Sequence, residues 1–272
     1  MTQWSTEFIP GEPRIAVDHA GAGALVVFLH GIGGNRTNWH DQLPFFARRF
    51  HAVAWDARGY GASQDYPGPL DFGDFAVDLA RVLDHFRVER AHLIGLSMGG
   101  MIALNFYCSY PQRVATLTVC DSLPGFDHLS AEQRREFIRL RQAPLLAGLE
   151  PKDIAPAVAK TLVGSSARIG SYERLVESMS ALHKESYLKT IAATVNYRRS
   201  FELENIKVPT HVVVGAEDRL TPPEMARQMT ARLPDARLSI IAGAGHLSNI
   251  EQPEKFNQAV LSFLLDHYST SR

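Results

Sequence analysis

The stretch Ala91-His-Leu-Ile-Gly-Leu-Ser-Met-Gly-Gly100 decides the fold that this sequence predicts. Its apolar start predicts a buried strand, and Met101-Ile-Ala-Leu-Asn-Phe106 predicts the helix that follows. Between them, Gly95-Leu-Ser-Met-Gly99 fits the pattern G-x-S-x-G, whose small residues permit a sharp turn that lifts the hydroxyl of Ser97 clear of the backbone. The alternative interpretation is a strand-to-helix glycine turn in which the serine is incidental.

Short apolar runs alternate with helix-period segments on both sides of this turn. This alternation predicts an α/β fold with a mostly parallel sheet and helices on both of its faces. Apolar residues recur at helical spacing in residues 72–86 and again in 256–264, which predicts two helices packed on the sheet. Six runs read as buried strands, namely 24–29, 52–55, 91–94, 114–119, 211–214 and 238–242.

The strand signals stop between residues 122 and 205. This stretch begins with Ser130-Ala-Glu-Gln133, a capping box at the start of a helix, and prolines and glycines divide it into several short helices. Strand signals resume after Val208-Pro209, so we interpret the block as an insertion that lies over the edge of the sheet like a lid. The expected division is a core of residues 1–121 and 206–272 and a helical cap of residues 122–205.

Composition excludes several classes of protein. The 272 residues hold 28 Lys+Arg against 29 Asp+Glu, so the basic surplus of a nucleic-acid binder is missing. The two cysteines, Cys108 and Cys120, have no zinc-ligand spacing, and we expect both to be buried in a reducing compartment. The start of the chain lacks a signal-peptide pattern, and the longest apolar run is far shorter than the ~20 residues that span a bilayer. We therefore expect a cytoplasmic protein without a membrane or metal site.

Two further residues complete a candidate catalytic group with Ser97. A serine hydroxyl is a weak nucleophile that needs a base, and the base needs an acid to orient it. Asp218 and His246 each follow the end of a predicted strand, and the chain order serine, acid, histidine fits this kind of turn. Open α/β sheets place their sites at the carboxyl ends of their strands. His246 could instead be a structural histidine, and Asp121, which also ends a strand, is the alternative acid.

A glycine-rich loop supplies candidate donors for an oxyanion. Attack on a carbonyl carbon creates a negative oxygen that preformed hydrogen-bond donors must meet. The loop His30-Gly-Ile-Gly-Gly34 follows the first predicted buried strand, and we expect the backbone N–H groups of Ile32 and Met98 to be the two donors. In the alternative reading, the glycines only turn the chain. They lack the third glycine of a dinucleotide fingerprint, so no cofactor is expected.

Several ordered motifs together resemble the α/β-hydrolase family over essentially the whole chain. They are His30-Gly31, Asp56-Ala-Arg-Gly-Tyr-Gly-Ala-Ser63, Gly95–Gly99, Asp218 and His246. The resemblance implies a central eight-stranded sheet, a helical cap between the sixth and seventh strands, and no cofactor.

A narrower resemblance concerns two of these motifs. The turn at Ser97 and the stretch His246-Leu-Ser-Asn-Ile-Glu-Gln-Pro253 are similar to 3-oxoadipate enol-lactonases, which open a lactone in aromatic-acid breakdown. The segment after His30 departs from those enzymes and is closer to general esterases. Carbon–carbon hydrolases of ring-cleavage products are further neighbours, although Leu96 and residues 247–249 do not match their pattern.

The first predicted cap helix carries four arginines. Glutamates interleave with them, which is typical of a solvated helix face, although one arginine could clamp a substrate carboxylate. The arginines are Arg134, Arg135, Arg139 and Arg141. Apolar residues that could line an acyl pocket, or form plain core, are Met98, Met101, Phe126, Phe137 and Met179.

The expected function is hydrolysis of a small carboxylic ester or lactone through an acyl-enzyme. Ser97 would attack, His246 would carry the proton, Asp218 would orient His246, and the amides of Ile32 and Met98 would bind the oxyanion. Carbon–carbon bond hydrolysis is one alternative. The other is a hydrolase-fold receptor that binds its ligand and turns it over slowly.

Overall fold

A computed structural model describes residues 3–198 and 202–268 of the chain. Within that part, eight strands form one sheet in the order β1-β2-β4-β3-β5-β6-β7-β8. β2 runs antiparallel to both β1 and β4, whereas all the other neighbouring strands are parallel. The strands are β1 (Ser5–Ile9), β2 (Ile15–Gly21), β3 (Leu25–Leu29), β4 (His51–Trp55), β5 (Ala91–Leu96), β6 (Val114–Cys120), β7 (Thr210–Gly215) and β8 (Ala236–Ile241).

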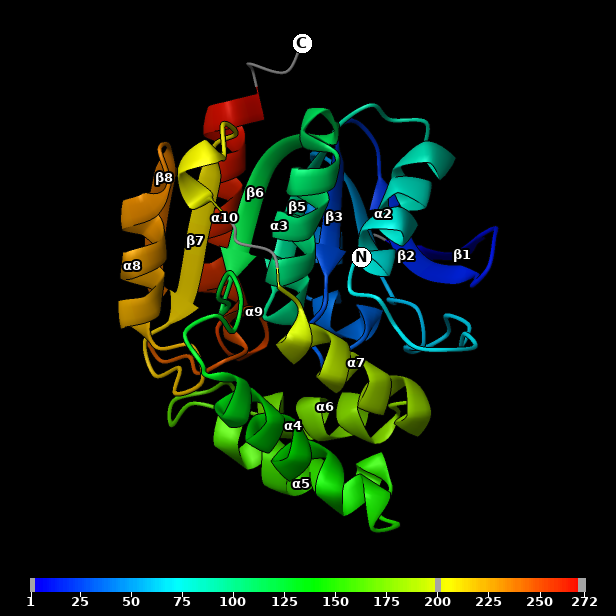
Figure 1. Cartoon of the computed structure of the whole chain (residues 1–272). Coiled ribbons are helices and arrows are strands. Elements are labelled where there is room, and N and C mark those ends of the chain that lie inside the picture. The colour runs from blue at the N-terminus through cyan, green and yellow to red at the C-terminus, as the bar shows by residue number, and fades with distance from the viewer. Residues whose placement is uncertain (1–2, 199–201, 269–272) are drawn as a thin grey trace.

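The central strands are buried because helices cover both faces of the sheet. Every residue of β3 and of β5 is buried. Figure 1 shows α2, α3 and α8 on one face of the sheet and α10 on the other. The helices of the described part are α1 (Leu43–Phe46), α2 (Asp74–His85), α3 (Met98–Ser109), α4 (Ala131–Leu146), α5 (Pro151–Leu162), α6 (Ser171–Ser180), α7 (Lys184–Asn196), α8 (Pro223–Arg232), α9 (Ser248–Glu251) and α10 (Pro253–Tyr268). The predicted α/β fold and both predicted helices are therefore confirmed.

The helices α4 to α7 follow β6 and precede β7 in the chain. They lie together beyond the carboxyl ends of the parallel strands, at the bottom of Figure 1. The predicted capping box starts α4, because the Ser130 hydroxyl accepts from the Gln133 amide at 3.2 Å and the Gln133 side chain accepts from the Ser130 amide at 2.8 Å. A set of helices thus stands over the edge of the sheet where the predicted site residues are expected.

The strands β1 and β2 are the elements that hydrophobic patterning missed. Asp18 and His19 interrupt the apolar run of β2, and Asp18 is nevertheless buried because Arg36 and His40 pair with its carboxylate at 3.0 and 2.8 Å.

Two expectations concern the cysteines and the membrane. Cys120 is buried, but Cys108 is only half-buried because it lies in the last turn of α3, so the prediction that both are buried is wrong for Cys108. No helix in residues 3–198 and 202–268 has the length and apolarity needed to cross a membrane.

Candidate active site

The turn between β5 and α3 holds Ser97 in an unusual backbone conformation. Its φ is 54° and its ψ is −117°, a region that residues with side chains rarely occupy. The Ser97 amide donates to the Cys120 carbonyl at 2.8 Å, and the Ser122 hydroxyl donates to the Ser97 carbonyl at 2.6 Å. A Cβ atom at Gly95 would clash with the carbonyl of Gly99. The motif glycine is therefore a steric requirement of this turn, as the sequence predicted.

His246 stands between Ser97 and Asp218. Its Nε2 atom lies 3.0 Å from the Ser97 Oγ, and its Nδ1 atom lies 2.9 Å from the Asp218 Oδ2. Asp218 also accepts hydrogen bonds from the amides of Leu220 and Thr221 at 2.8 and 3.0 Å, and from the Thr221 hydroxyl at 2.6 Å. Asp218 and His246 are buried, whereas Ser97 remains half-buried. The structure thus brings the three predicted side chains into one hydrogen-bonded chain.

The electrostatics of this chain suit a proton acceptor. Burial disfavours the imidazolium form, but the hydrogen bond and the negative charge of Asp218 outweigh burial and raise the pKa of His246. Burial likewise opposes ionisation of Asp218, but its bonds to His246 and Thr221 lower the pKa of that carboxyl on balance. The arrangement therefore favours an ionised Asp218 beside a histidine that readily accepts a proton.

Asp121, the alternative acid, is also buried but has other partners. Its carboxylate accepts from the Gly215 amide at 2.7 Å and from the amide and hydroxyl of Ser248 at 3.1 and 2.6 Å. Burial, followed by the charge of Asp218, raises the pKa of Asp121 to about 7. Asp121 thus joins the ends of β6 and β7 to the start of α9, while Asp218 is the carboxylate at Nδ1 of His246.

Glu251 holds the loop that carries His246, and the sequence had assigned it no role. The fully buried carboxylate accepts from the amides of Gly245 and Leu247 at 2.8 and 3.0 Å. It also accepts from the amide of Gly164, after α5, at 2.8 Å. Glu251 takes part in no hydrophobic periodicity. Its position within residues 246–253 is the one sequence feature that could have pointed to a role near His246. Glu251 therefore connects the His246 loop to the helices above it.

The loop after β3 passes beside Ser97, since a Cβ atom at Gly31 would lie 3.2 Å from the Ser97 Cβ. The Nε2 atom of His30 accepts from the Ala57 amide at 3.0 Å, which leaves its Nδ1 to donate to the Gly31 carbonyl at 2.8 Å. Burial lowers the pKa of His30, in keeping with a neutral ring. Within the described residues, the amides of Ile32 and Met98 donate to no other residue. Both groups are consequently available for an external oxygen.

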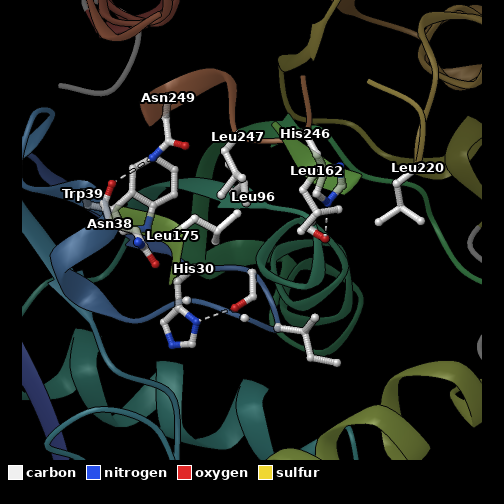
Figure 2. Close-up of a pocket in the computed structure, with 15 residues that line it drawn as sticks. His30, Asn38, Trp39, Leu96, Leu162, Leu175, Leu220, His246, Leu247 and Asn249 are labelled. Atoms are coloured by element: carbon white, nitrogen blue, oxygen red, sulfur yellow. Dashed lines mark hydrogen bonds between the residues drawn. The ribbon is translucent and has the colours of Figure 1, made fainter. Parts of the chain in front are cut away.

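Two cavities meet Ser97. The smaller, about 60 Å³, lies between Ser97, His246 and the loop after β3, and Figure 2 shows His30 hydrogen-bonded to that loop, with His246 above it in the view. The larger, about 740 Å³, is lined by α4, α5, α6 and α7 as well as by Ser97 and Ile32. All five apolar residues named in the sequence line it: Met98, Met101, Phe126, Phe137 and Met179. Ser97, the predicted nucleophile, therefore lies in the wall of a mainly apolar cavity.

The predicted solvated arginine face of α4 is wrong for one of its four members, Arg134. Arg134 is buried, and its guanidinium donates to the carbonyls of Leu129 and Phe126 in the preceding loop. Arg141 is exposed, as predicted, and it also lines the larger cavity. Arg139 does lie at the surface, where it pairs with Glu136 at 2.7 Å. The long arginine side chain explains the difference, because it reaches groups off its own helix face.

Comparison with known proteins gives one family match. A family model described as alpha/beta hydrolase fold matches residues 24–253. The 3-oxoadipate enol-lactonase 2 of Acinetobacter baylyi is 27% identical over 240 residues, which are 86% of this chain and 86% of its own length. The 2-hydroxy-6-oxononadienedioate/2-hydroxy-6-oxononatrienedioate hydrolase of Burkholderia vietnamiensis is 30% identical over 268 residues, covering 93% and 91% of the two chains.

Other similar proteins have different names. A relative in Caulobacter sp. carries the name of a carbamate hydrolase and is 29% identical over 88% of this chain and 90% of its own length. The solved structure of a thermophilic esterase from Thermogutta terrifontis, with malate bound, has a TM-score of 0.88 and 30% identity, and covers 97% of this chain and 99% of that one. The similar proteins thus share a fold and differ in the bond that their names describe.

Proposed function

The chain belongs to the α/β-hydrolase fold family, and within it we propose a serine hydrolase that cleaves a small carboxylic ester or lactone through an acyl-enzyme. One observation carries this proposal: the hydrogen-bonded chain from Ser97 through His246 to Asp218 opens into an apolar chamber. A serine, a histidine and a buried acid in this order form the arrangement that activates a serine hydroxyl.

The proposed reaction has two halves. In the first, the Ser97 Oγ attacks the carbonyl carbon while Nε2 of His246 takes its proton, and the amides of Ile32 and Met98 donate to the resulting oxyanion. His246 then gives the proton to the leaving oxygen, the carbon–oxygen bond breaks, and the acyl group stays on Ser97. In the second half, His246 takes a proton from water as the water attacks the acyl carbon, and Ser97 leaves protonated. Asp218 accepts from Nδ1 throughout and stabilises the imidazolium.

The enol-lactone of 3-oxoadipate is the narrower substrate that we propose. The motifs around Ser97 and His246 and the Acinetobacter relative support it. Carbon–carbon bond hydrolysis is the second candidate, supported by the Burkholderia relative at 30% identity. The loop from His30 to Gly34 favours an ester or lactone over that candidate, because its departure from the enol-lactonases is toward general esterases.

The test compares kcat/KM for 3-oxoadipate enol-lactone with kcat/KM for p-nitrophenyl butyrate, using Ser97→Ala as the blank. A lactone value orders of magnitude above the ester value, lost in the variant, would support both the triad and the enol-lactone. Turnover of the ester alone would leave a general esterase. Bleaching of a vinylogous diketone ring-cleavage product, with neither ester nor lactone turned over, would favour the carbon–carbon hydrolase.

The receptor alternative needs a separate measurement. Labelling of Ser97 by a fluorophosphonate reports an activated nucleophile but is silent on turnover. Protein that labels stoichiometrically and still shows no steady-state turnover of esters, lactones, an aryl carbamate or the diketone would contradict the proposed enzyme and favour a ligand receptor.

A further inference from the structure

The charged side chains that line the large cavity are basic. Arg141 from α4, Lys160 from α5 and Arg219 after β7 line it together with His128. Among the described residues, no aspartate or glutamate does so. Arg141, Lys160 and Arg219 are exposed to solvent at the wall of this mainly apolar chamber, and with no acid beside them in the wall their positive charges attract anions toward it.

Arg141 has the free donors that an anion requires. Its guanidinium carbon lies 3.2 Å from the centre of the Phe137 ring, and this stacking orients the guanidinium plane. No acidic side chain or carbonyl among residues 3–198 and 202–268 accepts a hydrogen bond from it, in contrast to Arg134 and Arg139 on the same helix. Arg219, in comparison, donates to the Val163 carbonyl at 3.2 Å.

The surroundings of Arg141 make an acceptor favourable there. Phe137 and Tyr187 line the same cavity. The Arg141 side chain is exposed at one end, but its packing among such groups lowers the pKa of the guanidinium, although an arginine stays charged at any physiological pH. A charge that has lost part of its hydration gains more from a hydrogen-bonded anion than a fully hydrated one does. The planar guanidinium matches the two oxygens of a carboxylate.

We propose that Arg141 binds a carboxylate of the substrate, so that the preferred substrates are anionic esters or lactones with an apolar body between the carboxylate and the reacting carbonyl. The inference rests on the proposed function, because Ser97 opens into the same cavity. It extends the negative charge that the enol-lactone of 3-oxoadipate carries to the whole class of preferred substrates, and it adds the residue that recognises that charge. Lys160 and Arg219 contribute long-range attraction to the entering anion.

The test uses two substrates that differ only in charge. They are mono-p-nitrophenyl glutarate, which has a free carboxylate, and its methyl ester, in which that carboxylate is capped. We expect the wild type to have the higher kcat/KM for the anion. In Arg141→Gln we expect this ratio to fall by roughly 10- to 100-fold, the size of a hydrogen-bonded charge pair, with little change for the methyl ester. Arg139→Gln on the same helix is the matched control and should keep the wild-type ratio.

Three further measurements separate loss of the anion site from a folding defect. Thermal unfolding checks Arg141→Gln, and Arg141→Lys, which keeps the charge but loses the planar fork, should give an intermediate ratio. Calorimetric titration with glutarate measures binding without turnover, and we expect weaker binding in Arg141→Gln than in Arg139→Gln.

The outcomes separate this inference from the proposed function. An anion-to-neutral ratio that is equal in Arg141→Gln and Arg139→Gln, or a wild type that prefers the methyl ester, would overturn the carboxylate site even if Ser97 hydrolyses both esters. If neither ester were turned over, the proposed hydrolase would fail. Glutarate binding that depends on Arg141 would then still support the anion site, and glutarate binding indifferent to Arg141 would refute it.

Discussion

The Nε2 atom of His246 lies 3.0 Å from the Oγ atom of Ser97, although 149 positions separate the two residues in the sequence. Ser97 follows β5 and His246 follows β8, with β6 and β7 between these strands in the sheet. The loop after β8 crosses the end of β7 so closely that a Cβ atom at Gly215 would clash with the carbonyl of Gly245. Glycines at this crossing allow the histidine that follows β8 to reach a serine three strands away.

The proposed triad predicts a non-additive pair of mutations. Ser97→Ala and His246→Ala should each lower kcat by about 10⁴- to 10⁶-fold, because the first removes the hydroxyl and the second removes the base that activates it. The double variant should be little slower than either single variant. Steady-state kinetics on p-nitrophenyl butyrate measure all three, and strictly additive losses would contradict a shared role.

The two buried aspartates should respond differently to the same substitution. Asp218→Asn should lower kcat by about 10⁴-fold, because an amide at Nδ1 favours the wrong tautomer of His246. Asp121→Asn should lose far less, since its carboxylate bonds to Gly215 and Ser248 and not to the imidazole. Kinetics of the two variants, with folding checked by circular dichroism, measure the contrast. Near-normal activity in Asp218→Asn would transfer the role of acid to Asp121.

The pH profile should reflect the raised pKa of His246. The base must be neutral, so kcat/KM for a neutral ester should rise with pH, with a midpoint above the ordinary histidine value of 6.5. The charge of Asp121 is one cause of the raised pKa, so Asp121→Asn should move the midpoint to lower pH. Asp121 has a pKa of about 7 and titrates in the same pH range as His246. The midpoint of the wild-type profile therefore reflects both groups. A wild-type midpoint below 6.5 would speak against this electrostatic account.

Glu251 should support both stability and rate. Glu251→Gln leaves one side-chain acceptor oxygen for the buried amides of Gly164, Gly245 and Leu247, so we expect a loss of about 1–3 kcal/mol in the free energy of unfolding. We also expect a lower kcat, because the loosened loop carries His246. Denaturant unfolding and kinetics measure the two effects.

A surface glutamate provides the control for that change. Glu217 accepts from the Ser165 amide at 2.6 Å in an exposed position, so Glu217→Gln should alter neither quantity appreciably. Equal behaviour of the two variants would refute the role assigned to Glu251.

Local sequence patterns predict the parts of the fold that depend on residues close together in the chain. The buried strands from β3 onward and the turn at Ser97 have strong sequence signals, whereas β2 mixes Asp18 and His19 into an edge region whose burial depends on partners far along the chain. The choice between Asp121 and Asp218 depends on which loop crosses β7, a property of three dimensions.

The same limit applies to the cap side of the site. Three arginines of α4 look alike in sequence but have different surroundings. Arg134 donates to backbone carbonyls, Arg139 pairs with a surface glutamate, and Arg141 lines the larger cavity. Only the packing of α4 in the folded chain, where it contacts α7, separates these environments. The sequence therefore predicts the reacting side chains of the site but not which residues contact the substrate.

Mass spectrometry of an acyl-enzyme tests the central claim most directly. The wild type is mixed with p-nitrophenyl butyrate, quenched in acid within the first turnover, digested, and compared with Ser97→Ala. We expect a burst of p-nitrophenol and the added mass of one butyryl group on the peptide that contains Ser97, both missing in the variant. Turnover without a burst or a modified peptide, or a butyryl group on another residue in both proteins, would contradict a nucleophilic role for Ser97.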